Sequence, residues 1–369
     1  MFSNDNEEKG KKFRLLAFNE YPKETRYMAA ISLLSAIILV FLFIFIWNSI
    51  SAKLENQEAI FTCNDGTFYD TCDLNKPYYC DSKTGLLIEN ASICGCPDGM
   101  SKSENSCVSQ YATEPKEISL KYILRGRENS LNFTAYNGLA NYLSSLPKSI
   151  NYAGAEKPLR ADFKLRNINN EEQRKLILPI LIAIQNTGEN KEEQARIAIS
   201  IVQNIKFGES DEILNFAGRI ELNYSRYPYE VLYDEEGVCG EKSELLAFLL
   251  KEIGYGVAFF YYPEENHEAL GIKCPVKYSV DKTGYCFIET TGHSIITDSK
   301  IEYFGGIKLK SKPEIILVSN GEALGSNMYE YKDAKKMIKF RDNWFVLFRE
   351  ARLSKLKEKY GLVEEYYSG

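Results

Sequence analysis

An uncharged apolar run near the N-terminus constrains this chain more than any other feature. From Tyr27 to Ala52 the sequence contains no Asp, Glu, Lys or Arg, and its centre reads "AISLLSAIILVFLFIFIW". A helix of about 20 such residues spans a hydrocarbon core about 30 Å thick. The run is longer than the apolar part of a signal peptide, and no clear small-x-small cleavage site follows it. We therefore expect an uncleaved transmembrane anchor helix at residues 27–50.

Basic residues on either side of this run set the expected orientation. Six Lys and Arg residues precede it, whereas only Lys53 follows closely. Because basic flanks stay on the cytoplasmic side, residues 1–26 are expected to be a cytoplasmic segment and the remainder to be extracellular. These observations predict a single-pass protein of the plasma membrane, with the membrane itself as a partner.

The composition argues against several other classes of function. The 369 residues are 44% hydrophobic and carry a net charge of −6. A packed core is therefore feasible, while nucleic acid, which binds basic surfaces, is not an expected partner. No G-x-G-x-x-G or G-x-x-x-x-G-K-[ST] segment occurs, so nucleotide binding has no support. We expect neither a metal nor an organic cofactor.

Most of the nine cysteines lie in one short segment, residues 61–108, which has few aliphatic residues and many turn formers. Such a segment cannot bury enough apolar surface to hold itself together, so disulfides are expected in an oxidising compartment. Zinc is the weaker alternative, since the segment has no C-x-x-C pair and no histidine. We expect a small disulfide-rich stalk whose pairing the sequence does not specify; its cysteines are Cys63, Cys72, Cys80, Cys94, Cys96 and Cys107.

The stretch "DEEGVCGEKSELLAFLLKEIGYG" places a cysteine at the start of an amphipathic helix pattern. Leucines and Ile253 form the apolar stripe, and Gly254 is suited to end the helix. Cys239 lies at or just before the first turn, where the positive end of the helix dipole favours a thiolate. The alternative is an ordinary small buried residue, because cysteine is common in protein cores.

Three strand patterns follow this helix, namely "YGVAFFYY", "HEALGIKC" and "YCFIETT". His267 opens the second strand and Glu289 ends the third, and in an antiparallel pair such positions are neighbours. A thiol, an imidazole and a carboxylate at one rim supply the three roles of nucleophilic catalysis. The alternatives are a surface histidine and an ordinary strand-end charge, or His293 as the base in place of His267.

These residues resemble the transglutaminase-like superfamily, a papain-related group that includes transglutaminases, peptide N-glycanases and microbial cysteine proteases. Gly237-Val238-Cys239 matches the family's G-x-C, and Gly237 to Glu241 matches the G-x-C-G-E of peptide N-glycanases. The run "GYCFIETT" stands where the family has G-W-x-x-x-D-P-T, with the cysteine, histidine and acid in the family's order. "QARIAISIVQNI" and "RYPYEVL" are similar to segments of membrane-anchored archaeal members. The resemblance covers about residues 115–300.

The resemblance implies an α+β fold with a papain/transglutaminase-like core, in which the cysteine helix packs on an antiparallel sheet carrying the histidine and the acid. It implies a thiol enzyme with Cys239 as nucleophile, His267 as base and Glu289 as the orienting acid. Two departures are the glutamate in place of aspartate and the missing tryptophan after the histidine. Candidate oxyanion donors are the backbone N–H of Cys239 and the side chain of Gln203.

The expected function is an extracellular enzyme that cleaves amide bonds of protein or peptide substrates through a cysteine acyl-enzyme. We favour hydrolysis, as in cysteine peptidases, over transfer to an amine as in acyltransferases, and deglycosylation is a further outcome. The alternative is an inactive transglutaminase-fold scaffold that binds partners at the cell surface. Cys274 and Cys286 flank the last turn of the sheet and are either a cross-strand disulfide or two buried thiols. Residues 301–369 are expected to add a strand and helices packed on this core.

Overall fold

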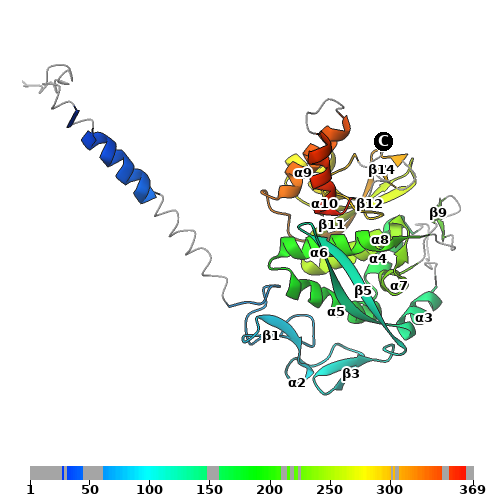
Figure 1. Cartoon of the computed structure of the whole chain (residues 1–369). Coiled ribbons are helices and arrows are strands. Elements are labelled where there is room, and N and C mark those ends of the chain that lie inside the picture. The colour runs from blue at the N-terminus through cyan, green and yellow to red at the C-terminus, as the bar shows by residue number, and fades with distance from the viewer. Residues whose placement is uncertain are drawn as a thin grey trace, which may run out of the picture. The chain divides into compact units, whose positions relative to one another are not determined.

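The structure is a computed structural model that describes most of the chain beyond the N-terminal region (Figure 1). The chain divides into two compact units, Met1–Phe61 and Thr62–Gly369. The described residues are 27–28, 31–44, 61–147, 158–208, 214–216, 220–222, 226–300, 302–303, 307–342 and 349–362.

The first unit does not bear out the expected transmembrane helix. Its described helical residues, 27–28 and 31–44, are exposed. Throughout the described part of the chain, no helix combines the length and apolarity needed to cross a membrane. This part of the predicted fold class is therefore wrong. Residues 29–30 and 45–50 of the expected anchor, and the segment 1–26, lie outside the described residues.

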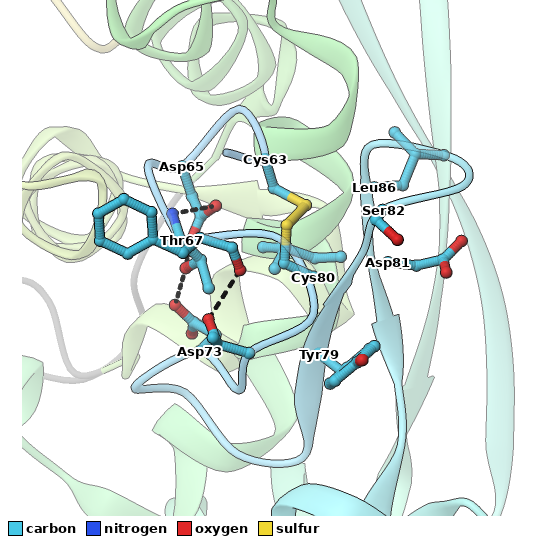
Figure 2. The surroundings of a disulfide bond; sticks show 12 residues. Cys63, Asp65, Thr67, Asp73, Tyr79, Cys80, Asp81, Ser82 and Leu86 are labelled. Atoms are coloured by element: carbon cyan, nitrogen blue, oxygen red, sulfur yellow. Dashed lines mark hydrogen bonds between the residues drawn. A yellow bond between two sulfur atoms is a disulfide. The ribbon is translucent and has the colours of Figure 1, made fainter. Parts of the chain in front are cut away.

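The cysteine-rich segment folds into two short hairpins and one helical turn. Three disulfides join Cys63 to Cys80, Cys72 to Cys94 and Cys96 to Cys107, which confirms the prediction of bridges and supplies their pairing. Figure 2 shows the first bridge beside the Thr67 hydroxyl, which donates to Asp65 and Asp73. The elements are β1 (Tyr78–Asp81), β2 (Leu86–Glu89), α2 (Ala91–Cys94), β3 (Met100–Ser103) and β4 (Ser106–Ser109).

Disulfides of this density indicate an oxidising, extracellular environment. The segment also packs on the rest of its unit, since Asn186 exchanges two 2.9 Å hydrogen bonds with the backbone of Leu87. Tyr78 and Leu87 are buried in the main hydrophobic core. The bridged segment is thus held both by covalent bonds and by contact with the helices.

A long hairpin and six helices form the first half of the main domain. The hairpin of β5 and β6 lies along α5 and α6 (Figure 1). Helix α5 continues through Pro179, where the sequence suggested a kink or break, because neighbouring turns are buried in the core and compensate for one missing N–H. The elements are β5 (Pro115–Leu124), β6 (Arg127–Tyr136), α3 (Asn137–Ser145), α4 (Arg160–Ile168), α5 (Glu171–Thr187), α6 (Lys191–Asn204), α7 (Pro228–Asp234) and α8 (Cys239–Ile253).

The second half is an antiparallel sheet with strand order β13-β12-β11-β16. Helix α8 packs on β11 and β12, so the described residues form an α+β fold. The three expected strands are β11 (Gly256–Tyr262), β12 (His267–Lys273) and β13 (Tyr285–Ile288), and β16 (Glu314–Asn320) adds an edge strand. A fourth disulfide, Cys274–Cys286, joins the residue that follows β12 to β13. This resolves the alternative that the sequence left open.

Two C-terminal helices support the loop that follows β13. Ile295 of this loop lies in a buried cluster with Met337 and Leu356, and Asp298 pairs with Arg341. The remaining elements are α9 (Tyr329–Asp342), α10 (Arg349–Tyr360), the 3-10 helices η2 (Val276–Tyr278) and η3 (Val280–Lys282), and the short strands β7 (Lys206–Phe207), β8 (Leu214–Phe216), β9 (Ile220–Leu222), β10 (Glu236–Gly237), β14 (Glu302–Tyr303) and β15 (Ile307–Lys308).

Candidate active site

Cys239 is the first residue of α8 and is partly exposed. All nine cysteines lie in described parts of the chain, and Cys239 is the one that forms no disulfide. The helix begins here because the Glu241 carboxylate accepts a 3.0 Å hydrogen bond from the Val238 N–H, a group that the helix leaves without a partner. Arg226 holds the same carboxylate with its backbone N–H and its guanidinium, both at 3.1 Å.

Close packing explains why residue 237, two positions before the cysteine, is a glycine. A Cβ at Gly237 would lie 3.2 Å from Val231 Cγ1 and 3.3 Å from Lys242 Cγ. Both neighbours are buried, so a side chain at this position would press on the first turn of α8. The G-x-C pattern is thus a packing requirement of this helix start.

His267 and Glu289 meet because of the register between β12 and β13. Leu270 is paired with Ile288, so Glu289 follows opposite Ala269, on the same side of the strand as His267. The distance from His267 Nε2 to Glu289 Oε2 is 2.9 Å. Both side chains are buried, with 2% and 1% of their surface exposed, which shields their interaction from water.

The imidazole also hydrogen-bonds the side chain of Cys239. Since Nε2 is engaged by the carboxylate, Nδ1 is the nitrogen left for the sulfur. The sequence-predicted cysteine, histidine and acid therefore lie in one hydrogen-bonded row. They are supplied by a helix start, a strand start and a strand end.

The charges in this row favour an ion pair. Burial alone would lower the pKa of His267, but the negative charge of Glu289 and the hydrogen bond to Cys239 raise it to about 10. Burial would raise the pKa of Glu289, but the imidazolium and hydrogen bonds from Thr291 hold it below its ordinary value. At neutral pH the site thus contains an imidazolium beside a carboxylate.

The glutamate is fully satisfied in spite of its extra methylene. Its Oε1 accepts hydrogen bonds from the backbone N–H groups of Thr290 and Thr291, both at 2.9 Å, and from the Thr291 hydroxyl at 2.8 Å. This leaves Oε2 directed at His267. The longer side chain reaches the histidine because one carboxylate oxygen is anchored in the turn that follows the strand.

Gln203 lies behind the acid. Its Nε2 donates to the backbone carbonyl of Glu289 at 2.8 Å and to the Ser294 hydroxyl at 3.1 Å. Its Oε1 accepts from the Ser294 N–H at 3.4 Å. Both amide hydrogens are thereby used, so this arrangement favours a positioning role over the expected oxyanion role. The backbone N–H of Cys239, in the first turn of α8, stays the candidate oxyanion donor.

Replacing Gln203 with leucine should lower the free energy of unfolding by about 1–3 kcal/mol, because the Glu289 carbonyl and the Ser294 hydroxyl would lose a buried donor. Urea denaturation of the wild type and the variant measures this. A variant of unchanged stability that is defective only with acyl substrates would instead identify Gln203 as an oxyanion donor.

His293, the other histidine, lies in the loop after Thr291. Burial and the nearby charge of Lys242 hold the pKa of His293 below its ordinary value, so this imidazole is disposed to be neutral. The imidazole that hydrogen-bonds Cys239 belongs to His267.

Sequence reasoning missed Lys242, which is fully buried one turn after Cys239. A signal was present, since this lysine extends the apolar stripe of α8 at helical spacing through Leu245 and Leu246. A charged residue on the buried face of a helix requires partners inside the fold.

The described residues contain no group of three or more His, Cys, Asp or Glu side chains able to hold a metal ion. The side chains of the candidate site are a thiol, an imidazole and a carboxylate in series. In comparisons with known proteins, no family model and no curated protein matched the sequence.

Proposed function

We propose that this chain is an extracellular thiol enzyme of the transglutaminase-like type, acting on amide bonds of protein or peptide substrates. The observation that carries the proposal is the buried His267–Glu289 pair hydrogen-bonded to the one cysteine outside the disulfides. The resemblance of "GVCGE" and "GYCFIETT" to the family's motifs supports the same assignment.

In the proposed reaction, the Cys239 thiolate attacks the carbonyl carbon of the amide. The developing oxyanion is stabilised at the helix start by backbone N–H groups. His267 gives its proton to the departing amine nitrogen as the C–N bond breaks, leaving an acyl-enzyme thioester. His267, now neutral, takes a proton from the second nucleophile, which attacks the thioester and restores the thiolate. Glu289 orients the imidazole and stabilises its cation throughout.

Water as the second nucleophile gives hydrolysis, and an amine gives transfer. The acyl-enzyme is common to both, so the same three residues serve either outcome. We assign hydrolysis, because water is present at far higher concentration than any competing amine. The acceptor is identified by incubating the protein with a peptide library in the presence and absence of a primary amine and weighing the products.

The test is the pH dependence of Cys239 alkylation by iodoacetamide in the full chain with its disulfides intact. A thiolate–imidazolium pair should react at a plateau rate from about pH 5 to 7, whereas an ordinary thiol reacts only above about pH 8. His267→Ala should abolish the plateau and lower the rate at pH 6 at least about 100-fold, because the thiol then has no buried cation beside it.

His293→Ala is the matched control and should keep the plateau, since it removes the other imidazole of the chain. A wild-type profile with a single rise above pH 8 that ignores His267→Ala would overturn the enzyme assignment. The remaining interpretation would then be a scaffold that retains the fold and binds partners.

A further inference from the structure

Lys242 is a buried cation that the proposed reaction does not itself require. It stands on α8 one turn after Cys239, and its side chain is fully buried. A lysine is almost never enclosed in this way unless its ammonium group has partners that offset the lost hydration. The groups around the ammonium therefore indicate the role of its charge.

The ammonium group joins three parts of the site. Its Nζ donates a 2.6 Å hydrogen bond to the backbone carbonyl of Ile205, where α6 ends. A second hydrogen bond of 3.3 Å goes to the carbonyl of Thr291, two residues beyond Glu289. The nucleophile helix is thus tied to the turn that anchors the acid, by contacts that lie 37 and 49 residues away along the chain.

Charge balance supplies the second argument. In its reactive form the row contains a thiolate, an imidazolium and a carboxylate, which together carry one net negative charge. Enclosing an unbalanced charge is costly, and the interaction of Lys242 with the charges of Glu289 and Cys239 is favourable. The nearby Glu241 is already balanced by Arg226, so Lys242 is the cation that brings the row to neutrality.

The titration of these groups is mutually linked. Burial lowers the pKa of Lys242 to about 7, against the opposing influence of the negative charges on Glu289 and Cys239. The charge of Lys242 in turn contributes to the lowered pKa of His293, after burial. The titratable groups that interact with the charge of Lys242 are Cys239 on its own helix, and Glu289 and His293 on the loop after β13, residues 289–298, called the acid loop here. His267 contacts both Cys239 and Glu289.

We propose that Lys242 is a positioning residue whose buried ammonium stabilises the thiolate form of Cys239 and holds the acid loop against α8. This inference rests on the proposed function, because it concerns the ionised state of the same cysteine. It predicts that the charge of Lys242 controls the pH range over which Cys239 reacts.

The test compares Lys242→Met and Lys242→Gln with the wild type, using the full chain and the iodoacetamide profile. Removing the charge should raise the acid-side pH midpoint of alkylation by at least about one unit, which is about a tenfold lower rate at pH values below the wild-type midpoint. Both variants should show this, because both are neutral. If glutamine, which can still donate to the two carbonyls, restores the wild-type midpoint, the charge has no such role.

Lys251→Met is the matched control, because it removes one positive charge from the same helix at a partly exposed position. Its midpoint should equal that of the wild type. A wild type without an acid-side plateau defeats the proposed function itself. A wild-type plateau whose acid-side midpoint is unchanged in both Lys242 variants defeats only this inference.

A second measurement needs no variant to fold. The ε-carbon resonance of Lys242 is followed by NMR against pH in lysine-labelled protein, before and after Cys239 is capped with iodoacetamide. Capping replaces a thiolate by a neutral thioether, so the titration midpoint of Lys242 should fall. An unchanged midpoint would show that the two charges are not coupled and would overturn the inference.

Discussion

Replacing Glu289 with glutamine should lower the alkylation rate of Cys239 at pH 6 by about two orders of magnitude, with little change in shape at the site. The reason is electrostatic, because an adjacent opposite charge displaces an ionisation equilibrium by roughly tenfold to a thousandfold. The carboxylate lies 2.9 Å from His267 and is nearly fully enclosed. Turnover of an amide substrate should fall at least as far.

The tautomer of the histidine explains why glutamine is not a mild replacement. Its carbonyl oxygen can still accept from Thr290 and Thr291, as Oε1 does now. Its NH2 group would then face His267 Nε2, so that nitrogen would have to accept a hydrogen bond and the ring proton would move to Nδ1. The imidazole would donate to the thiol instead of taking its proton.

The control for this prediction is Glu244→Gln, which replaces another fully buried carboxyl group, located on α8. This substitution should change the free energy of unfolding and leave the pH profile of Cys239 alkylation unchanged. A Glu289→Gln protein that keeps both the plateau and the rate would remove the acid from the proposed reaction.

The largest effect on stability is expected at a second buried charge cluster, centred on Lys164 of α4. Its Nζ lies 3.2 Å from Glu244 Oε1 and 2.5 Å from Glu268 Oε1. Asn167 donates to Glu244 at 3.1 Å, and Arg160 lies 3.9 Å from Glu268. Two enclosed carboxylates on different elements, α8 and β12, thus depend on one fully buried ammonium.

Lys164→Met should therefore lower the free energy of unfolding by about 3–5 kcal/mol at pH 8, since breaking a buried ion pair leaves its partners uncompensated. Burial raises the pKa of Glu244 to about 7, and Lys164 opposes that rise. A carboxyl group whose pKa is higher in the folded state than in the unfolded state makes its full contribution to stability below the unfolded-state pKa of about 4.5. It loses this contribution as the pH rises through the folded-state pKa.

The loss caused by Lys164→Met should accordingly be greatest at pH 8 and smaller at pH 5, where Glu244 binds a proton. Urea denaturation at the two pH values measures it. The control is Lys121→Met. Because the partner of Lys121, Glu128, is largely exposed, this substitution should lower the free energy of unfolding by under about 1 kcal/mol at either pH. Equal losses for Lys164→Met at pH 5 and 8 would contradict the assigned charge state of the cluster.

Local patterns were sufficient to predict the elements that bring the three candidate residues together. The apolar stripe of residues 243–253 predicted the helix, and its structure begins at Cys239 and ends before Gly254. Alternation and turn residues predicted a strand that begins with His267, as β12 does. They also predicted a strand that ends with Glu289, whereas β13 ends one residue earlier, at Ile288. These features are readable because helix and strand periods depend on neighbours only a few residues apart.

Local patterns did not predict the features that depend on helix length or on contacts between residues far apart in the sequence. Apolarity at residues 27–50 predicted a membrane span, yet no helix among the described residues is long and apolar enough to cross a membrane. The count of cysteines indicated bridges, but their pairing depends on which Cα atoms approach within about 6 Å in the fold. For Gln203, helical position alone gave no sign that both amide hydrogens hold the acid loop.

The sequence by itself determined the chemical types in the candidate site, their order along the chain and the secondary structure that carries them. Only the tertiary structure decided which charges are enclosed. Lys242 is marked in the sequence only by its place on the apolar stripe of α8. The partners of Lys242 and Lys164, such as Thr291 and Glu268, belong to distant elements. The physical reason is that burial, and with it the strength of an electrostatic interaction, is a property of packing between elements that no local period encodes.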